Sequence, residues 1–107
     1  MTVRELLESV DSARPNDICD DIKIRLINDV EGRILCEICK KQPSEVTSLL
    51  GEDDILSVPE PYSRVYMLYL VSMLELMAGN YSAYSSVSAE FDKAFVEYGK
   101  WYLRNKG

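Results

Sequence analysis

YSRVYMLYLVSMLELMAGN (residues 62–80) followed by YSAYSSVSAEFDKAFVEYGKWYLRN (residues 81–105) is the stretch that decides the fold of this 107-residue chain. The first half is apolar almost throughout and stops at Gly79-Asn80, a pair typical of helix C-termini. The second half carries a heptad-like stripe, spaced alternately by four and three residues, at Tyr84, Ser88, Phe91, Phe95, Tyr98 and Tyr102. This spacing is typical of helices packed side by side in antiparallel bundles.

The joint between the two halves is too short for any connection other than an αα-hairpin. We expect its first helix to begin at Pro61 or Tyr62, because proline suits the first helical position, and to end near Ala78. The second helix should run from Tyr81 to about Asn105.

Two more helices are expected upstream of this hairpin. Thr2 and Glu5 have the spacing of a capping box, and a helix should follow until shortly before Pro15. Its apolar positions are Val3, Leu6, Leu7 and Val10.

The next helix is expected to be capped by Asn16 or Asp17 and to end near Lys40-Lys41, where two cations suit the helix dipole. Its predicted buried stripe is Ile22, Leu26, Val30, Ile34 and Ile38, widened by Ile27 and Leu35. Lys23 and Glu31 fall off this stripe. Gly32 lies in its middle and costs about 1 kcal/mol relative to alanine, which a close helix–helix approach would compensate.

Residues 41–61 hold three of the four prolines and are expected to form one long irregular loop, with a short helical turn over 44–50 capped by Ser44. Glu52, Asp53 and Asp54 form a candidate flexible acidic loop. Three carboxylates could bind a hard cation loosely, but they lack the ligand spacing of an EF-hand, so a solvated acidic loop is the favoured interpretation.

Length and patterning together predict an all-α fold, a small bundle of about four helices in a single domain over residues 1–107. The chain has 12 basic and 18 acidic residues, a formal net charge of −6. Gripping a nucleic-acid backbone requires clustered cations, so sequence-specific nucleic-acid binding is disfavoured. No apolar run approaches the length of a membrane span, and the N-terminus lacks a signal-peptide pattern, so we expect a protein made and used in the cytosol.

Residues capable of chemistry are few. Cys36 and Cys39 form a CxxC pair, but Cys19 is the only other cysteine and the chain has no histidine, so an intramolecular zinc site with four sulfur or nitrogen ligands is impossible. The favoured interpretation is three reduced thiols, with Cys36 and Cys39 packed beside Ile38. Lacking histidine, a phosphate-binding loop and a nucleophile elbow, the chain is expected not to be an enzyme and to need no cofactor and no small-molecule substrate.

The seven tyrosines all lie in the last two predicted helices, and Trp101 stands beside the last of them. One small hairpin cannot bury every ring and satisfy every hydroxyl, so some rings either reach solvent or contact another protein. Tyrosine and tryptophan are enriched in contact hot spots. The candidate interface residues are Tyr69, Tyr98, Trp101, Tyr102 and Arg104.

The order of these features resembles the small head–tail connector (adaptor) proteins of tailed bacteriophages and prophages. The similarity rests on packing and turn patterns in four stretches that span nearly the whole chain, with residues 40–55 as the gap. These are TVRELL (2–7) with Val10-Asp11; Arg14-Pro15-Asn16 with KIRLINDVEGRI (23–34); Pro59-Glu60-Pro61-Tyr62 with Val65-Tyr66 and Tyr69-Leu70; and Gly79-Asn80-Tyr81 with Tyr84, Phe91, Ala94-Phe95, Glu97-Tyr98 and Lys100-Trp101-Tyr102.

The resemblance implies a virion structural protein whose copies form a ring of about a dozen, joining the head portal to the tail around the DNA exit channel. It implies self-association and contacts with portal and other neck or tail proteins. It places the protein in the host bacterial cytoplasm during assembly and afterwards at the head–tail junction. A different class remains open: a small cytosolic helical regulator of the antitoxin or anti-repressor kind. An enzyme that uses carboxylates and a metal is the third and least favoured class.

Overall fold

The computed structural model describes residues 1–46 and 49–106, and these form an all-α bundle without a regular strand. The bounds of the elements are α1 (Val3–Ala13), α2 (Asp20–Arg33), the π-helical turn η1 (Ile34–Ile38), the 3-10 turn η2 (Pro43–Glu45), α3 (Arg64–Met77) and α4 (Tyr81–Lys106). The expected helical bundle with a C-terminal αα-hairpin is confirmed.

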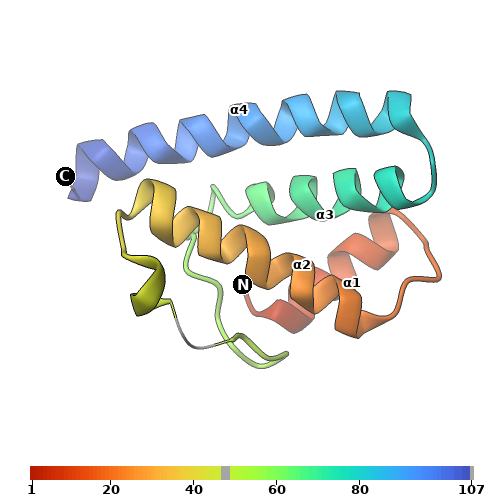
Figure 1. Cartoon of the computed structure of the whole chain (residues 1–107), viewed down its shortest axis with the longest axis horizontal. Helices are drawn as coiled ribbons and strands as arrows, with labels where there is room; N and C mark the ends of the chain where they lie inside the picture. The colour runs from red at the N-terminus through yellow and green to blue at the C-terminus, as the bar shows by residue number, and fades with distance from the viewer. Residues whose placement is uncertain (47–48, 107) are drawn as a thin grey trace.

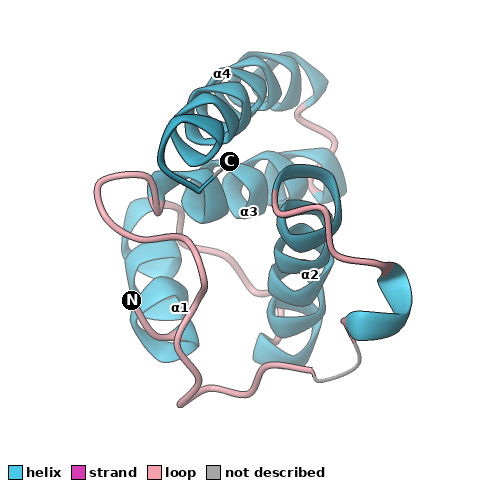
Figure 2. Cartoon of the chain, turned by 90° about the vertical axis from the view of Figure 1, so that its left-hand side faces the viewer, coloured by secondary structure: helices cyan, strands magenta, loops and turns pink. Residues whose placement is uncertain are grey.

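The helices form three layers (Figure 1). α4 covers one side of α3, and α1 and α2 both lie on the other side. Seen along the bundle, α1 and α2 stand apart with α3 above the space between them (Figure 2). α3 is therefore the central element, which explains why its sequence is apolar on nearly every side.

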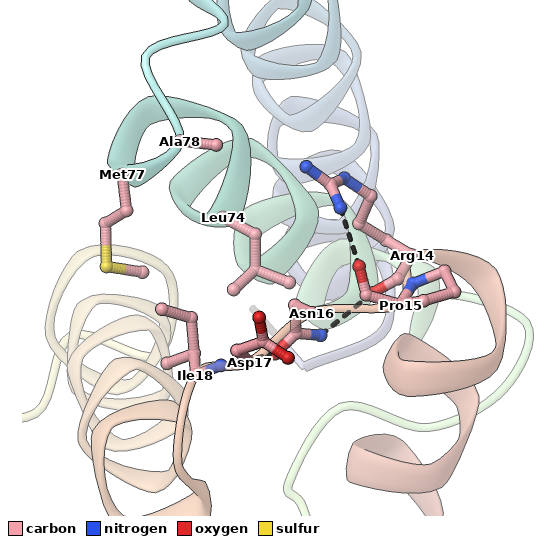
Figure 3. A pocket seen from close by; sticks show the side chains of 8 residues that line it. All are labelled: Arg14, Pro15, Asn16, Asp17, Ile18, Leu74, Met77 and Ala78. Atoms are coloured by element: carbon pink, nitrogen blue, oxygen red, sulfur yellow. Dashed lines mark hydrogen bonds between the residues drawn. The ribbon is translucent and has the colours of Figure 1, made fainter.

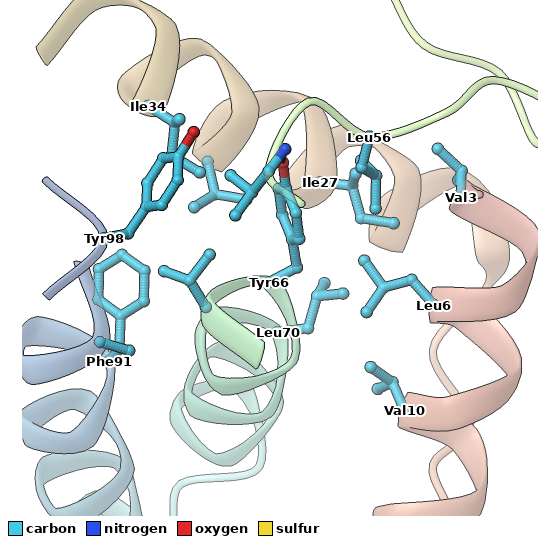
Figure 4. Close-up of a cluster of buried hydrophobic side chains, with 14 of the residues drawn as sticks. Val3, Leu6, Val10, Ile27, Ile34, Leu56, Tyr66, Leu70, Phe91 and Tyr98 are labelled. Atoms are coloured by element: carbon cyan, nitrogen blue, oxygen red, sulfur yellow. Dashed lines mark hydrogen bonds between the residues drawn. The ribbon is translucent and has the colours of Figure 1, made fainter. Parts of the chain in front are cut away.

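The core runs from α1 through α3 to α4 (Figure 4). Val65, Tyr66 and Leu70 of α3 are buried at its centre, with side chains from all the other helices packed around them. α4 contributes Phe91, Ala94 and Tyr98, so the centre of its predicted stripe is buried, whereas Tyr84, Ser88, Phe95 and Tyr102 lie half-buried on its borders.

The joint between α3 and α4 follows the sequence signals at Gly79 and Asn80. Gly79 adopts a positive φ of 79°, which glycine tolerates because it has no Cβ. The backbone N–H of Asn80 then donates to the carbonyl of Glu75 at 2.9 Å and closes the end of α3.

α3 begins at Arg64 rather than at Pro61 or Tyr62, because residues 60–63 form tight turns in which Tyr62 N–H donates to the Pro59 carbonyl.

The capping box of α1 is present: Thr2 Oγ1 accepts from the Glu5 N–H, and the Glu5 carboxylate accepts from the Thr2 N–H. α2, however, begins at Asp20, and neither Asn16 nor Asp17 caps it. Asn16 instead forms a local turn, its side-chain oxygen accepting from the Ile18 N–H at 3.1 Å. This use of asparagine competes with a helix cap.

The predicted stripe of α2 is wrong in its first turns. Ile22 is 40% exposed and Leu26 only half-buried, whereas Lys23 is 2% exposed and Ile27 is fully buried. The Lys23 ammonium lies 2.6 Å from the Asp11 carboxylate of α1, and this ion pair turns the lysine side of α2 inward. Toward the C-terminus, Val30, Ile34 and Ile38 are buried as expected.

α2 also ends earlier than Lys40-Lys41. In the π-helical turn η1 the Cys39 N–H donates a hydrogen bond to the Ile34 carbonyl. The next residue, Lys40, has a positive φ of 61° and ends the helix. The close approach expected at Gly32 is absent, since a Cβ there would meet nothing within 4 Å. Instead, Gly99 of α4 faces Ile38, at 3.8 Å for a Cβ, so α4 crosses the bundle at η1.

The long loop between η1 and α3 contains the 3-10 turn η2, capped by Gln42 rather than Ser44. The turn predicted over 44–50 overlaps it only at its start, and residues 47 and 48 lie outside the described part of the chain. The loop returns along the N-terminus, where Thr2 and Ile55 form one isolated antiparallel bridge.

Candidate protein-contact surfaces

The aromatic residues at the C-terminal end of α4 pack on one another. Tyr62, from the turn before α3, lies 5.7 Å from Tyr98 and 5.4 Å from Trp101, measured between ring centroids. Tyr98 stacks on Trp101 at 5.8 Å. This aromatic cluster of Tyr62, Tyr98, Trp101 and Tyr102 closes the bundle where α4 passes the start of α3.

This packing involves three of the candidate interface residues. Tyr98 is 3% exposed, and burial raises the pKa of its phenol to about 12, so the expectation that it contacts a partner is corrected. Trp101 and Tyr102 are half-buried within the same protomer, and Arg104 is exposed at the end of α4.

Tyr69 lies on a different part of the hairpin. Its ring is 5.4 Å from Phe91, and the Arg33 guanidinium sits over Phe91 and Phe95 at 5.6 and 5.2 Å. Burial, with the charge of Asp29, raises the pKa of Tyr69. Tyr69 contacts Phe91, which precedes Trp101 on α4 by ten residues, or about 15 Å along the helix, so Tyr69 and Trp101 do not form one surface.

The acidic loop, defined here as residues 51–55, is tied to the start of α1. The Arg4 guanidinium lies 3.2 Å from Glu52 and 2.9 Å from Asp53. The Val3 N–H donates to the Asp54 carbonyl, and the Arg4 N–H donates to the Glu52 carbonyl. The loop backbone therefore provides hydrogen-bond acceptors for N–H groups in the first turn of α1, which have no partner within the helix. Within the described residues, no three acidic or cysteine side chains converge to hold a metal ion.

A buried polar network that the sequence pattern did not suggest links α2, α3 and the loop. The Tyr66 hydroxyl donates to Glu31 at 2.6 Å and accepts from the Val58 N–H at 3.0 Å. Both the hydroxyl and the N–H of Ser57 donate to the same carboxylate. Burial and the Glu31 charge raise the pKa of Tyr66 well above its usual value. The network holds residues 57 and 58 against the core, which is a structural role.

The pocket between the α1–α2 connection and the end of α3 has a volume of 310 Å³ (Figure 3). The side chains of Arg14 and Asn16 already have partners in the chain. Arg14 Nε lies 2.6 Å from Glu75, Arg14 Nη1 donates to the Pro15 carbonyl, and the Asn16 amide donates to the Arg14 carbonyl. These contacts fasten the connection to α3 rather than leave groups waiting for a ligand.

The solvent face of α4 carries a second heptad-spaced row, opposite its buried stripe. We call the row Ala89, Lys93, Val96, Lys100 and Leu103 the outer seam; all five residues are exposed, Val96 by 52% and Leu103 by 61%. A shallow groove of 380 Å³ follows it, and Asp92 and Glu97 border it. The spacing of the seam is present in the sequence, but its residues are smaller or charged, whereas the other stripe carries the large aromatic residues.

The acidic loop also has an exposed apolar residue. The side chain of Ile55 is 72% exposed and follows three acidic residues. In Figures 1 and 2 the loop lies at the side of the molecule opposite α4. The protein thus exposes apolar side chains on opposite sides of one bundle, along the outer seam and at Ile55.

No helix in the described residues is both long and apolar enough to cross a membrane. Comparisons with family models, curated proteins and solved structures returned no match to this chain.

Proposed function

We propose that this chain is a structural subunit of a bacteriophage head–tail connector, assembling into a ring between the head portal and the tail around the DNA exit channel. The resemblance described above supports this proposal along nearly the whole chain. The helical bundle agrees with the fold that the resemblance implies.

The observation that carries the proposal is the exposure of apolar side chains on opposite sides of the bundle, Val96 and Leu103 in the outer seam of α4 and Ile55 in the acidic loop. A subunit of a closed ring needs two different contact surfaces, because each copy touches one neighbour on each side.

The charge of the chain suits a position around DNA. A net charge of −6 repels the phosphate backbone, so DNA can pass without being retained.

A small helical regulator is the second candidate, and the outer seam favours it as well. A partner helix recognises residues at heptad spacing, so the seam could receive one helix of a target protein. A regulator of this kind would remain a monomer or dimer, whereas a connector subunit forms a much larger species.

Native mass spectrometry over a concentration series, with and without a portal ring, tests the proposal. We expect a discrete species of about a dozen copies, alone or bound to the portal. Monomers or dimers under all conditions, with no binding to the portal, would overturn the connector assignment and leave the regulator.

A further inference from the structure

We infer that α4 pairs with α4 of a second copy of this chain, antiparallel and about a two-fold axis near Val96. The outer seam of one copy then covers the outer seam of the other. The inference does not rest on the proposed function. In a connector the pair covers the seam until a ring forms, and in a regulator it is the final assembly.

The first argument is that charge is segregated along the exposed side of α4. The N-terminal half of this side carries three acids and one cation: Glu90, Asp92, Glu97 and Lys93. No acid follows Glu97 in the sequence, and the C-terminal half exposes the cations Lys100 and Arg104. The groove as a whole is close to neutral, but its two halves have opposite signs.

Only an antiparallel pair brings opposite signs together in both halves. With the axis at Val96, Lys100 of each copy lies opposite Asp92 of the other, and Arg104 lies within one helical turn of Glu90. A parallel pair would place acids on acids and cations on cations. The two-fold symmetry repeats each favourable contact, as in any isologous dimer.

The second argument is the order of apolar residues along the seam. Ala89, Val96 and Leu103 are spaced by seven residues. The axis at Val96 therefore places the large Leu103 against the small Ala89 of the other copy, and the two valines against each other. A parallel pair would set leucine on leucine and leave a gap at the alanines. The aliphatic stems of the two seam lysines add apolar contact area.

The third argument is access. α4 lies along one edge of the molecule, and the other helices all lie on one side of it (Figures 1 and 2). A second α4 can therefore lie along the outer seam without meeting the rest of the bundle.

The size and centre of the contact make it reversible. Ala89 and Leu103 are about 21 Å apart along the helix, a length too short to bury the roughly 800 Å² per partner of a standard stable interface. Two copies of Glu97 flank the axis, and Lys93 and Lys100, one turn away on the same helix, reduce their repulsion. We expect a dissociation constant in the micromolar range.

Cysteine cross-linking tests the contact. All variants are made in a background of Cys19→Ser, Cys36→Ala and Cys39→Ala. Val96→Cys treated with a short bismaleimide should yield dimers, because the axis brings the two copies of this position together. Ser85→Cys, exposed on the same helix, is the matched control. Its two copies lie about 33 Å apart along an antiparallel pair, so its yield should be at most about one tenth.

A mixing experiment tests the direction of pairing. Ala89→Cys and Leu103→Cys are cross-linked separately and as an equimolar mixture. In an antiparallel pair each variant alone keeps its cysteines about 21 Å apart, whereas the mixture brings the two positions opposite each other. Links in the mixture alone are expected. Links in each variant alone would show a parallel pair and overturn the inference. Far-UV circular dichroism of every variant checks that the bundle remains folded.

A charge exchange tests the basis of recognition. Lys100→Glu with Arg104→Glu makes both halves of the face acidic, and the dissociation constant should rise at least about tenfold. Adding Glu90→Lys and Asp92→Lys exchanges the two halves and restores the formal net charge of −6. The dissociation constant should then return to within about threefold of the wild type. A four-residue variant as weak as the two-residue variant overturns the inference.

Sedimentation velocity of the wild-type chain over a concentration series gives the dissociation constant. A monomer at about 1 mM, or a Val96→Cys yield equal to that of Ser85→Cys, overturns the inference. The result is separable from the proposed function. A dimer without portal binding would keep this contact and reject the connector, whereas rings on the portal with a monomeric free chain would keep the connector and reject this contact.

Discussion

The two long faces of α4 share one spacing and differ in everything else. The buried stripe places Phe91, Ala94 and Tyr98 against α3, whereas the outer seam places Val96 and Leu103 in solvent between lysines. The comparison teaches that heptad spacing identifies a face able to pack, and that side-chain size and charge decide whether that face is buried in the core of the chain.

Phe91→Ala is expected to have the largest effect, because it removes a buried ring that touches Tyr69 and Phe95. The free energy of unfolding should fall by about 3–5 kcal/mol in urea titrations followed by circular dichroism. Val96→Ala, five residues along on the exposed face, is the matched control and should change stability by no more than about 0.5 kcal/mol. Equal losses would break the distinction between the two faces.

Tyr66→Phe extends the comparison to polar groups. It deprives Glu31 of a donor and leaves the Val58 N–H without its acceptor, so the free energy of unfolding should fall by about 1–3 kcal/mol. Tyr81→Phe, which removes an exposed hydroxyl at the start of α4, should be neutral. A neutral Tyr66→Phe would show that the buried network does not hold the loop.

Trp101→Ala tests whether the end of α4 belongs to the buried or to the exposed face. Since Trp101 packs on Tyr62 and Tyr98, we expect the free energy of unfolding to fall by about 1–3 kcal/mol. Unfolding is followed by far-UV circular dichroism, because the substitution removes the single tryptophan and with it the tryptophan fluorescence signal. Leu103→Ala should leave stability nearly unchanged. If Trp101→Ala is as stable as the wild type, Trp101 does not stabilise the bundle and is again a candidate for contact with a partner protein.

Asp11→Asn has the smallest expected effect and depends on pH. The Lys23 ammonium lowers the pKa of Asp11, so the folded state gains stability above the ordinary aspartate pKa of about 3.9 and loses it as the pH falls through the lowered value. The variant should be less stable than wild type at pH 7, and the difference should shrink below about pH 4. Urea titrations across pH measure this, with Asp92→Asn as the exposed control; a difference independent of pH would contradict the assignment.

The sequence predicted the elements with local signals and missed those set by contact between helices. The capping box, the Gly79-Asn80 joint and the hairpin were all legible, because each depends on residues a few positions apart. The first turns of α2 were misread, since the ion pair of Lys23 with Asp11 crosses from one helix to another. Glu31 was placed outside the stripe for the same reason: its donors come from residues 57 and 66.

Among the candidate site residues, the residue types were informative and the positions were not. Aromatic rings in α4 pointed to packing, but only the fold distinguishes Tyr98, buried in the protomer, from Leu103, exposed in the seam. The acidic residues were visible as a charged run, yet their attachment to Arg4 requires the loop to return to the N-terminus.

The amino-acid sequence by itself determined that this protein is helical and that its last two helices form a hairpin, because hydrophobic periodicity and turn residues act over a few positions. It also set the acidic net charge. Only the tertiary structure decided which face of each helix is buried, which carboxylate joins the core and which apolar residues remain exposed on opposite sides. Those outcomes depend on how distant segments share a limited interior, and no local pattern carries that information.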